Sequence, residues 1–204
     1  GESGVRSEPE EIAVEVEVEV EEWGAKPLSE VELYFLVDFR QRLRWALHAA
    51  EALAYVHSFS QAYVHRDIKS PNFLVTNDLT LKLCDFGELR SWRLSGGMTG
   101  WRGTYKHMAP ELMMHGGRYG RYSQAVDVYS LALVFWELLT GGVPFNHLTT
   151  RWAVINAVTS GERPPVPSGT PVAYRRLLQR MWHRRPAQRP RASEVVALLR
   201  RMVA

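Results

Sequence analysis

The sequence predicts an α+β fold that is mostly helical, and three observations carry this prediction. Two long segments, 40–57 and 126–139, follow the helical period, whereas the strand patterns are short. With 46% hydrophobic and 23% charged residues, a chain of 204 residues can form one domain, or a small pair, around a sizeable core. No apolar stretch reaches the about 18 to 20 residues that a membrane-spanning helix needs, which argues against a membrane protein.

The N-terminal region is acidic, and the rest of the chain is basic. Residues 1–32 contain eleven Glu against one Arg and one Lys, for a local charge of −9, so the remainder carries +12. Residues 1–11 are polar and Glu-rich, and we expect an acidic disordered tail there. No run of five or more basic residues occurs, which favours solvated Arg side chains over a nucleic-acid partner.

Strand patterns occur in two places. Val and Glu alternate strictly within residues 12–22, which predicts a strand with one apolar and one acidic face. Farther along, the short segments 73–75 and 81–83 flank the turn residues Thr76-Asn77-Asp78. This arrangement predicts a small hairpin.

The helical patterns differ from one another. In segment 40–57 the residues that share one face predict an amphipathic helix. They are Leu43, Leu47, Ala50, Ala54 and His57. Segment 126–139 is apolar nearly all the way round, which is typical of a helix buried on every side, and Gly141 is placed to cap its end. We expect Trp136 and Trp182 in the core and Ser193 as the N-cap of a last helix.

The number of cysteines and the N-terminal sequence indicate the cellular compartment. Cys84 cannot form an internal disulfide, and no signal-peptide pattern is visible, so we expect a cytoplasmic protein, with the nucleus not excluded. We interpret Cys84 as a small buried hydrophobe on a strand. The first residue is Gly1 rather than Met, which indicates a processed chain or a fragment.

Three short motifs occur in a fixed order. His65-Arg66-Asp67-Ile68-Lys69-Ser70-Pro71-Asn72 comes first, Asp85-Phe86-Gly87 follows, and Ala109-Pro110-Glu111 comes last. This set resembles the signature of the protein kinase family. The resemblance implies a kinase-like C-lobe over residues 29–204. It also implies a residual N-lobe strand and hinge over residues 12–28, so that only a remnant of the N-lobe β-sheet is present.

The same resemblance assigns roles to five residues. Asp67 would accept the proton of the substrate hydroxyl, and Lys69 would place a positive charge beside the γ-phosphate. Asn72 and Asp85 would supply oxygen ligands to Mg²⁺, brought together by the hairpin between them. Leu74 resembles the apolar floor under adenine. The implied cofactors are therefore ATP and Mg²⁺.

Other matches resemble structural features of the family. Glu111 and Arg189 match a buried ion pair that ties the end of the activation segment to the C-terminal helices. Asp127, at the start of the buried helix, matches the residue that holds the backbone of His65 and Arg66.

The activation segment spans residues 85–111 and contains Ser91, Ser95 and Thr99. Arg66 is placed as in kinases whose catalytic loop binds a phosphorylated activation loop, and Thr99 is the best candidate for that phosphate. The pair Gly103-Thr104 resembles serine/threonine kinases, in which Thr104 would bond to the catalytic loop. Segments 105–108 and 134–141 resemble the tyrosine-kinase-like branch, whose members mostly phosphorylate Ser and Thr.

The sequence also departs from the family. No G-x-G-x-x-G occurs, and the only lysine before the catalytic loop is Lys26, which falls at the expected hinge and does not match the β3 Lys. The hinge match places Val20 as gatekeeper and makes the backbones of Glu21 and Trp23 partners of adenine.

Two interpretations follow from these departures. In the first, the chain is a fragment of an active serine/threonine kinase with a protein substrate, and by itself it is inactive or nearly so. In the second, it is a pseudokinase-like scaffold that binds a protein partner. Retention of the residues matched to catalysis and metal binding favours the first, because a scaffold has no physical need of metal ligands.

Overall fold

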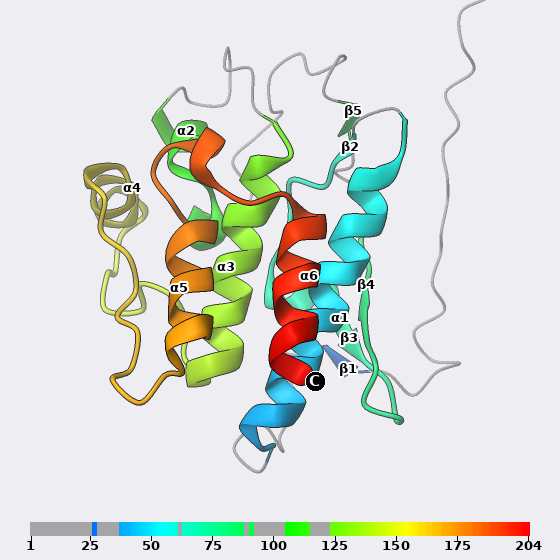
Figure 1. Ribbon diagram of the computed structural model, residues 1–204. Helices are drawn as coiled ribbons and strands as arrows, with labels where there is room; N and C mark the ends of the chain where they lie inside the picture. Colours follow the sequence, from blue (N-terminus) through cyan, green and yellow to red (C-terminus); the bar gives the residue numbers. More distant parts are fainter. Residues whose placement is uncertain (1–25, 28–36, 61–62, 88–89, 92–104, 115–122) are drawn as a thin grey trace, which may run out of the picture.

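The computed structural model shows a bundle of helices with a small sheet on one side. It describes residues 26–27, 37–60, 63–87, 90–91, 105–114 and 123–204. Figure 1 shows α1 (Phe39–Ser58), α6 (Ala192–Val203), α3 (Ala125–Thr140) and α5 (Val172–Met181) side by side. Helix α1 packs against α3, α6 and the sheet, and α5 packs against α3 and α6. The predictions for segments 1–11 and 12–22 fall outside the described residues.

Helix α1 confirms the helix predicted over 40–57. Its N-cap is Asp38, whose Oδ1 accepts a hydrogen bond from the Gln41 backbone N–H at 2.8 Å. The buried stripe differs from the predicted face, because α3, α6 and the sheet cover α1 from several directions. Leu43 and Ala50 are buried as expected, whereas Leu47 is only partly buried. Further buried side chains are Trp45, Ala46, Ala49, Leu53 and Val56.

Helix α3 confirms the predicted core helix. Every residue from Val126 to Leu138 is buried, as expected for a segment that is apolar nearly all round. The helix ends at Gly141, whose φ of 70° lies in the left-handed region and whose N–H donates to the Glu137 carbonyl at 2.8 Å. Trp136 and Trp182 are buried, as predicted.

The prediction that Ser193 caps the last helix is wrong. Helix α6 begins at Ala192, and its N-cap is Arg191. The Glu194 carboxylate accepts a hydrogen bond from the Arg191 backbone N–H at 2.7 Å, which satisfies that donor at the helix start. Ser193 therefore lies within the first turn of α6.

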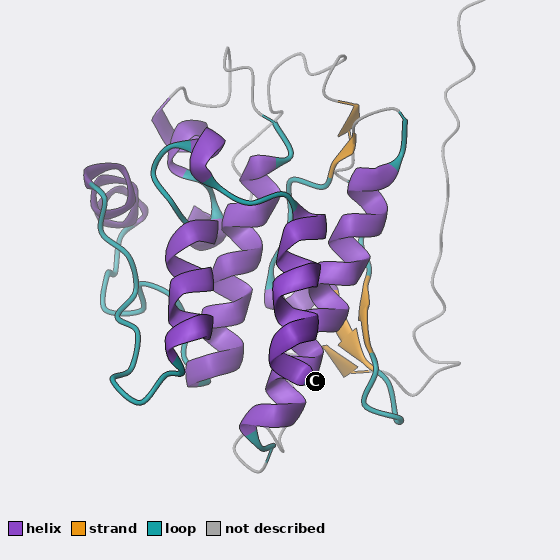
Figure 2. Cartoon of the chain, viewed as in Figure 1, coloured by secondary structure: helices purple, strands orange, loops and turns teal. Residues whose placement is uncertain are grey.

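The strands are short and form two small sheets, which Figure 2 shows beside the helices. The predicted hairpin is confirmed: β3 (Phe73–Val75) pairs antiparallel with β4 (Leu81–Leu83). Strand β1 (Lys26–Pro27) adds to the other edge of β3, with Lys26 opposite Val75. Strand β2 (Tyr63–Val64) pairs with β5 (Arg90–Ser91).

Two further α-helices and three 3-10 turns complete the described part of the fold. They are α2 (Pro110–Met114), α4 (Arg151–Ser160) and the 3-10 turns η3 (Ser70–Asn72), η4 (Tyr105–His107) and η5 (Pro186–Gln188). The architecture is mostly helical with little strand, as the sequence predicts. In the part of the chain that the structure describes, no helix has both the length and the apolar character to cross a membrane.

Candidate active site

The loop between β2 and η3 brings together three of the predicted site residues. The Lys69 Nζ lies 2.5 Å from the Asp67 Oδ2, and both side chains are mostly buried. Asn72 Nδ2 donates to the backbone carbonyl of Asp67 at 2.8 Å and to the Asp67 Oδ2 at 3.1 Å. One carboxylate oxygen of Asp67, Oδ2, therefore accepts hydrogen bonds from both an ammonium and an amide.

The hairpin places Asp85 next to this loop. Strand β4 ends at Leu83, and the Cys84 backbone N–H then donates to the Asn72 carbonyl at 2.9 Å. Asp85 has a φ of 61°, a left-handed conformation that is uncommon for a residue other than glycine. Its side chain is exposed, and its Oδ1 accepts from the Gly87 N–H at 3.3 Å.

Cys84 differs from its prediction. It follows β4 instead of lying in it, and it is only half-buried. Its Sγ lies 3.2 Å from the Asn72 carbonyl oxygen, to which it donates. Burial raises the pKa of the Cys84 thiol, and the nearby Asp85 carboxylate raises it further, while Lys69 acts in the opposite direction. A raised pKa favours the thiol over the reactive thiolate.

Leu74 is buried in β3, where its backbone lies opposite Pro27 of β1. The residues matched to the gatekeeper and the hinge backbone, Val20, Glu21 and Trp23, fall outside the described residues. The structure thus places Lys26 and Pro27, at the end of the predicted strand and hinge, beside β3.

Asp127 anchors the start of the catalytic loop, as the resemblance implies. Its Oδ2 accepts from the His65 N–H and its Oδ1 from the Arg66 N–H, each at 2.8 Å. Arg66 has a φ of 69°, so the two hydrogen bonds hold a left-handed backbone that is otherwise unfavourable. The His57 Nε2, from the end of α1, lies 2.8 Å from the same Oδ2.

This contact of His57 is not expected from the sequence, in which His57 only shares the apolar face of a helix. The sequence gives little indication of this contact, because Asp127 lies 70 positions away from His57. The His57 and Asp127 side chains are both nearly inaccessible, with exposed fractions of 7% and 1%. They form a buried link between α1, α3 and the catalytic loop.

The His65 side chain is fully buried and packs edge-on against Phe86, with the ring centroids 5.4 Å apart. Burial lowers the pKa of His65, although the Asp127, Asp67 and Asp85 carboxylates act to raise it. The ring therefore favours its neutral form and connects the catalytic loop to the Asp85-Phe86-Gly87 motif.

The predicted ion pair at the end of the activation segment is present. Arg189 contacts Glu111 with two parallel hydrogen bonds, Nη1 to Oε1 at 2.6 Å and Nη2 to Oε2 at 2.8 Å. The Arg189 guanidinium also donates to the carbonyls of Ala125 and His183. Its side chain is fully buried, and that of Glu111 is 18% exposed. Through these hydrogen bonds Arg189 connects α2 to α3 and to the turn before α6.

A second buried contact near α2 was not expected from the sequence. The His107 Nε2 lies 3.1 Å from the Glu137 Oε2, and the His107 carbonyl accepts from the Ser130 hydroxyl at 2.8 Å. Both partners lie on α3, so this helix holds the segment before Ala109 at two points. The candidate phosphorylation site Thr99, together with Ser95 and Thr104, lies outside the described residues.

The arrangement also fits a magnesium ion. Asn72 uses its Nδ2 on Asp67, which leaves its Oδ1 as an acceptor, and Asp85 offers an exposed carboxylate. Hard oxygen donors of this kind suit Mg²⁺, which proteins bind through one or two side chains together with phosphates and water. No cluster of three or more His, Cys, Asp or Glu that could hold a metal ion occurs among the described residues.

The chain matches the protein kinase domain over residues 30–198. It belongs to the protein kinase family. Similar proteins include the serine/threonine-protein kinase STY17 of Arabidopsis thaliana, 37% identical over 161 residues that cover 79% of this chain and 27% of that protein. The putative mitogen-activated protein kinase kinase kinase 7-like of Drosophila melanogaster is 38% identical over 166 residues, which cover 78% of this chain and 41% of that protein.

A third relative, the dual specificity protein kinase shkC of Dictyostelium discoideum, is 35% identical over 162 residues, 78% of this chain and 31% of that protein. These relatives agree with the tyrosine-kinase-like branch that the sequence predicts. The chain spans between about a quarter and two fifths of the length of these relatives.

Proposed function

We propose that residues 29–204 form the large lobe of a protein serine/threonine kinase, which transfers the γ-phosphoryl group of ATP to a Ser or Thr hydroxyl of a protein. The observation that carries this proposal is the Asp67 carboxylate, contacted by Lys69 at 2.5 Å and by Asn72 at 3.1 Å beside the Asp85 motif. Phosphoryl transfer requires mainly orientation and charge neutralisation, and these four side chains supply both.

In the proposed reaction Asp67 orients the acceptor hydroxyl and takes its proton. Its carboxylate is preorganised, because Lys69 and Asn72 both hold Oδ2. The Lys69 ammonium lies beside it and would neutralise negative charge that develops on the transferring group. Lys69 thus serves two functions: it positions the base before transfer and stabilises charge during it.

Asn72 and Asp85 are the residues that would hold Mg²⁺, with the oxygen atoms described above. The metal would neutralise phosphate charge and orient the nucleotide. Leu74, opposite Pro27, would contact adenine from below, because a buried apolar side chain suits the face of a flat ring.

The acceptor class rests on the resemblance of Asp67-Ile68-Lys69 and Gly103-Thr104 to serine/threonine kinases. Two relatives carry serine/threonine or dual specificity in their names, which supports Ser and Thr as acceptors. The substrate is accordingly a protein with an accessible Ser or Thr.

The test joins the chain to the small lobe of a relative such as STY17, because the sequence contains no Gly-rich loop or matching β3 lysine. In this chimera, Asp67→Asn should lower the kcat for phosphate transfer to a basic protein by about 100-fold or more. Asp78→Asn, in the exposed β3–β4 turn, is the matched control and should retain activity. The 204-residue chain alone should show little or no transfer.

Two results would contradict the proposal. Unchanged turnover in Asp67→Asn would remove Asp67 from the mechanism. A chimera that is folded and binds Mg-ATP but transfers no phosphate would favour the alternative, a pseudokinase-like scaffold that binds a protein partner.

A further inference from the structure

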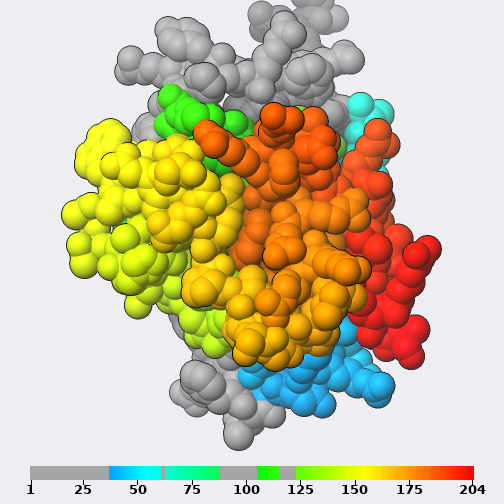
Figure 3. All heavy atoms as spheres, turned by 60° about the vertical axis from the view of Figure 1, so that its left-hand side comes forward, coloured from blue at the N-terminus to red at the C-terminus, as the bar shows by residue number. Residues whose placement is uncertain are grey.

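The C-terminal part of the chain carries an unusual concentration of positive charge. Residues 163–193 contain eight Arg and no Asp or Glu. They include α5, the turn that follows it and the first residues of α6. In Figure 3 this region, coloured orange, forms a continuous surface between the yellow atoms of α4 and the red atoms of α6.

Five of these arginines form what we call the arginine surface. They are Arg176, Arg180, Arg184, Arg185 and Arg191, and all five are exposed. Among the described residues, no carboxylate lies within ion-pair distance of their side chains. The other three arginines differ, because they donate to carbonyl groups or, in one case, pair with Glu111.

Two further arginines of this region, the half-buried Arg163 and the buried Arg189, share one aromatic neighbour. Arg163 and Arg189 lie over the Tyr129 ring, with their guanidinium carbons 5.0 and 5.1 Å from its centroid. Burial lowers the pKa of Arg163, and the nearby Arg189 and Arg184 lower it further, against the opposing effects of Tyr129 and Glu111. Arg184 of the arginine surface is therefore close enough to Arg163 for their charges to repel, and an anionic partner would relieve this repulsion.

The chain itself contains a segment with the complementary charge. Residues 8–22 carry eight Glu and no basic residue. In an extended segment, side chains on one face recur every two residues, or about 6.6 Å. On α5, Arg176 and Arg180 are four positions apart, which corresponds to about 6 Å along the helix axis. The spacing of the alternating Glu side chains therefore matches the spacing of Arg176 and Arg180.

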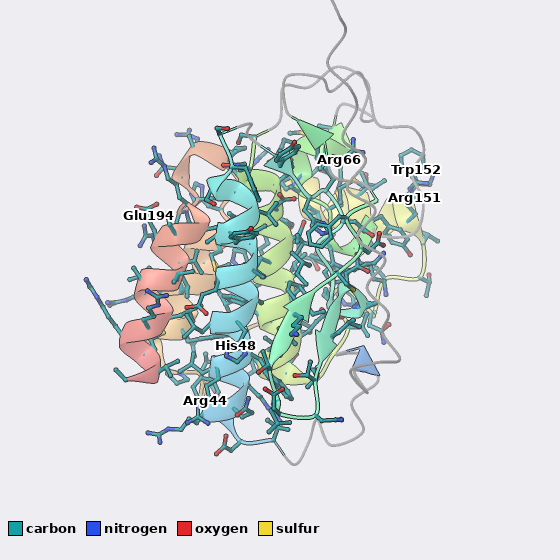
Figure 4. The ribbon with its side chains drawn as sticks, turned by 90° about the vertical axis from the view of Figure 1, so that its right-hand side faces the viewer. Arg44, His48, Arg66, Arg151, Trp152 and Glu194 are labelled. Carbon is teal, nitrogen blue, oxygen red and sulfur yellow. The ribbon has the colours of Figure 1, made fainter. Side chains whose placement is uncertain are left out.

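We propose that the arginine surface binds a glutamate-rich segment in extended conformation, and that this segment is residues 8–22 of a second copy of the chain. A second copy is the source because Glu22 can lie at most about 14 Å from Lys26, given the reach of four residues. Lys26 belongs to β1, which Figure 4 shows on the side of the molecule opposite α5 and α6.

The first experiment measures binding of a fluorescent peptide of residues 8–22 to the 204-residue chain by fluorescence anisotropy. We expect saturable binding that weakens as salt rises, because salt screens exposed charges. The double variant Arg176→Gln and Arg180→Gln should raise the Kd about fivefold to tenfold, the size expected for two exposed ion pairs. A peptide in which every Glu is Gln should not bind.

The matched control is a second row of two arginines. Arg40 and Arg44 are also four positions apart and exposed, near the N-terminal end of α1, where Figure 4 shows Arg44. The double variant Arg40→Gln and Arg44→Gln removes the same charge and should change the Kd by less than about twofold. An equal loss in both double variants would show that only net charge matters, and would overturn the proposal.

The second experiment tests the source and the class of the partner. Sedimentation velocity of the full chain should show association that rises with protein concentration and that salt or the free peptide reverses. Association that salt strengthens would indicate apolar contact instead and would overturn the second-copy assignment. An RNA oligonucleotide that binds the arginine surface, and that the peptide fails to displace, would also overturn the proposal. Neither experiment depends on kinase activity.

Discussion

Two Arg–Glu ion pairs in different regions show how burial changes what such a pair contributes to stability. The Arg189–Glu111 pair joins the turn before α6 to α2, with a fully buried Arg and a Glu that is 18% exposed. The Arg200–Glu51 pair joins α6 to α1, with side chains that are 66% and 38% exposed. The shortest distances are similar, 2.6 and 2.8 Å, so geometry alone does not distinguish them.

The difference lies in what remains when one partner is removed. A fully buried guanidinium without its carboxylate has no water to solvate it, whereas an exposed one is solvated at once. The buried pair therefore constrains the end of the activation segment, and the exposed pair contributes little to the packing of α6 on α1.

The largest effect is expected for Glu111→Gln. Because Arg189 would keep its charge in a buried position, we expect a loss of about 3 to 5 kcal/mol in the free energy of unfolding. Urea denaturation followed by circular dichroism measures this loss. A change no larger than that of an exposed pair would mean that the other acceptors of Arg189, the Ala125 and His183 carbonyls, suffice to stabilise it.

Asp127→Asn should have the next largest effect. An amide has one acceptor oxygen where the carboxylate has two, so either the His65 or the Arg66 backbone N–H loses its partner. A buried donor without an acceptor costs about 1 to 3 kcal/mol. Faster hydrogen exchange at these two amides, with α5 unaffected, would localise the loss; unchanged exchange would contradict the anchoring role of Asp127.

His65 predicts a pH dependence of stability. Its pKa in the folded protein lies below the ordinary value of 6.5, chiefly because of burial, so the unfolded chain binds the proton more readily. The stabilisation associated with the neutral ring is complete above about pH 6.5 and decreases as the pH falls below it. Unfolding of the wild type and of His65→Phe should be compared at about pH 7.5 and about pH 5.5. The wild type should lose more stability in acid; an equal loss would contradict the prediction.

The smallest effect is expected for Glu51→Gln. The pair with Arg200 is exposed, so the expected loss is about 0.5 kcal/mol or less, and it should disappear at high salt. Urea denaturation at two salt concentrations provides the measurement. A loss approaching that of Glu111→Gln would show that exposure does not explain the contrast between the two pairs.

The sequence predicted the elements and residues whose signal is local. Helices α1 and α3 and the β3–β4 hairpin follow from periodicity and turn residues within each segment. The family, the approach of Asn72 to Asp85 and the Glu111 pair follow from motifs at recognisable spacings. The start of α6 was predicted wrongly because the N-cap is Arg191, whose backbone N–H donates to the Glu194 carboxylate, and not Ser193.

Tertiary structure decided which polar side chains became buried partners. Nothing in the periodicity of α1 indicates that His57 contacts Asp127, or in the apolar pattern of α3 that Glu137 contacts His107. Likewise, nothing in the sequence indicates that Arg200 contacts Glu51, which lies 149 positions away. A local pattern encodes a helix because its hydrogen bonds join near neighbours along the chain. Burial and pairing depend on segments that meet only after the helices pack, and so they appear only in the folded molecule.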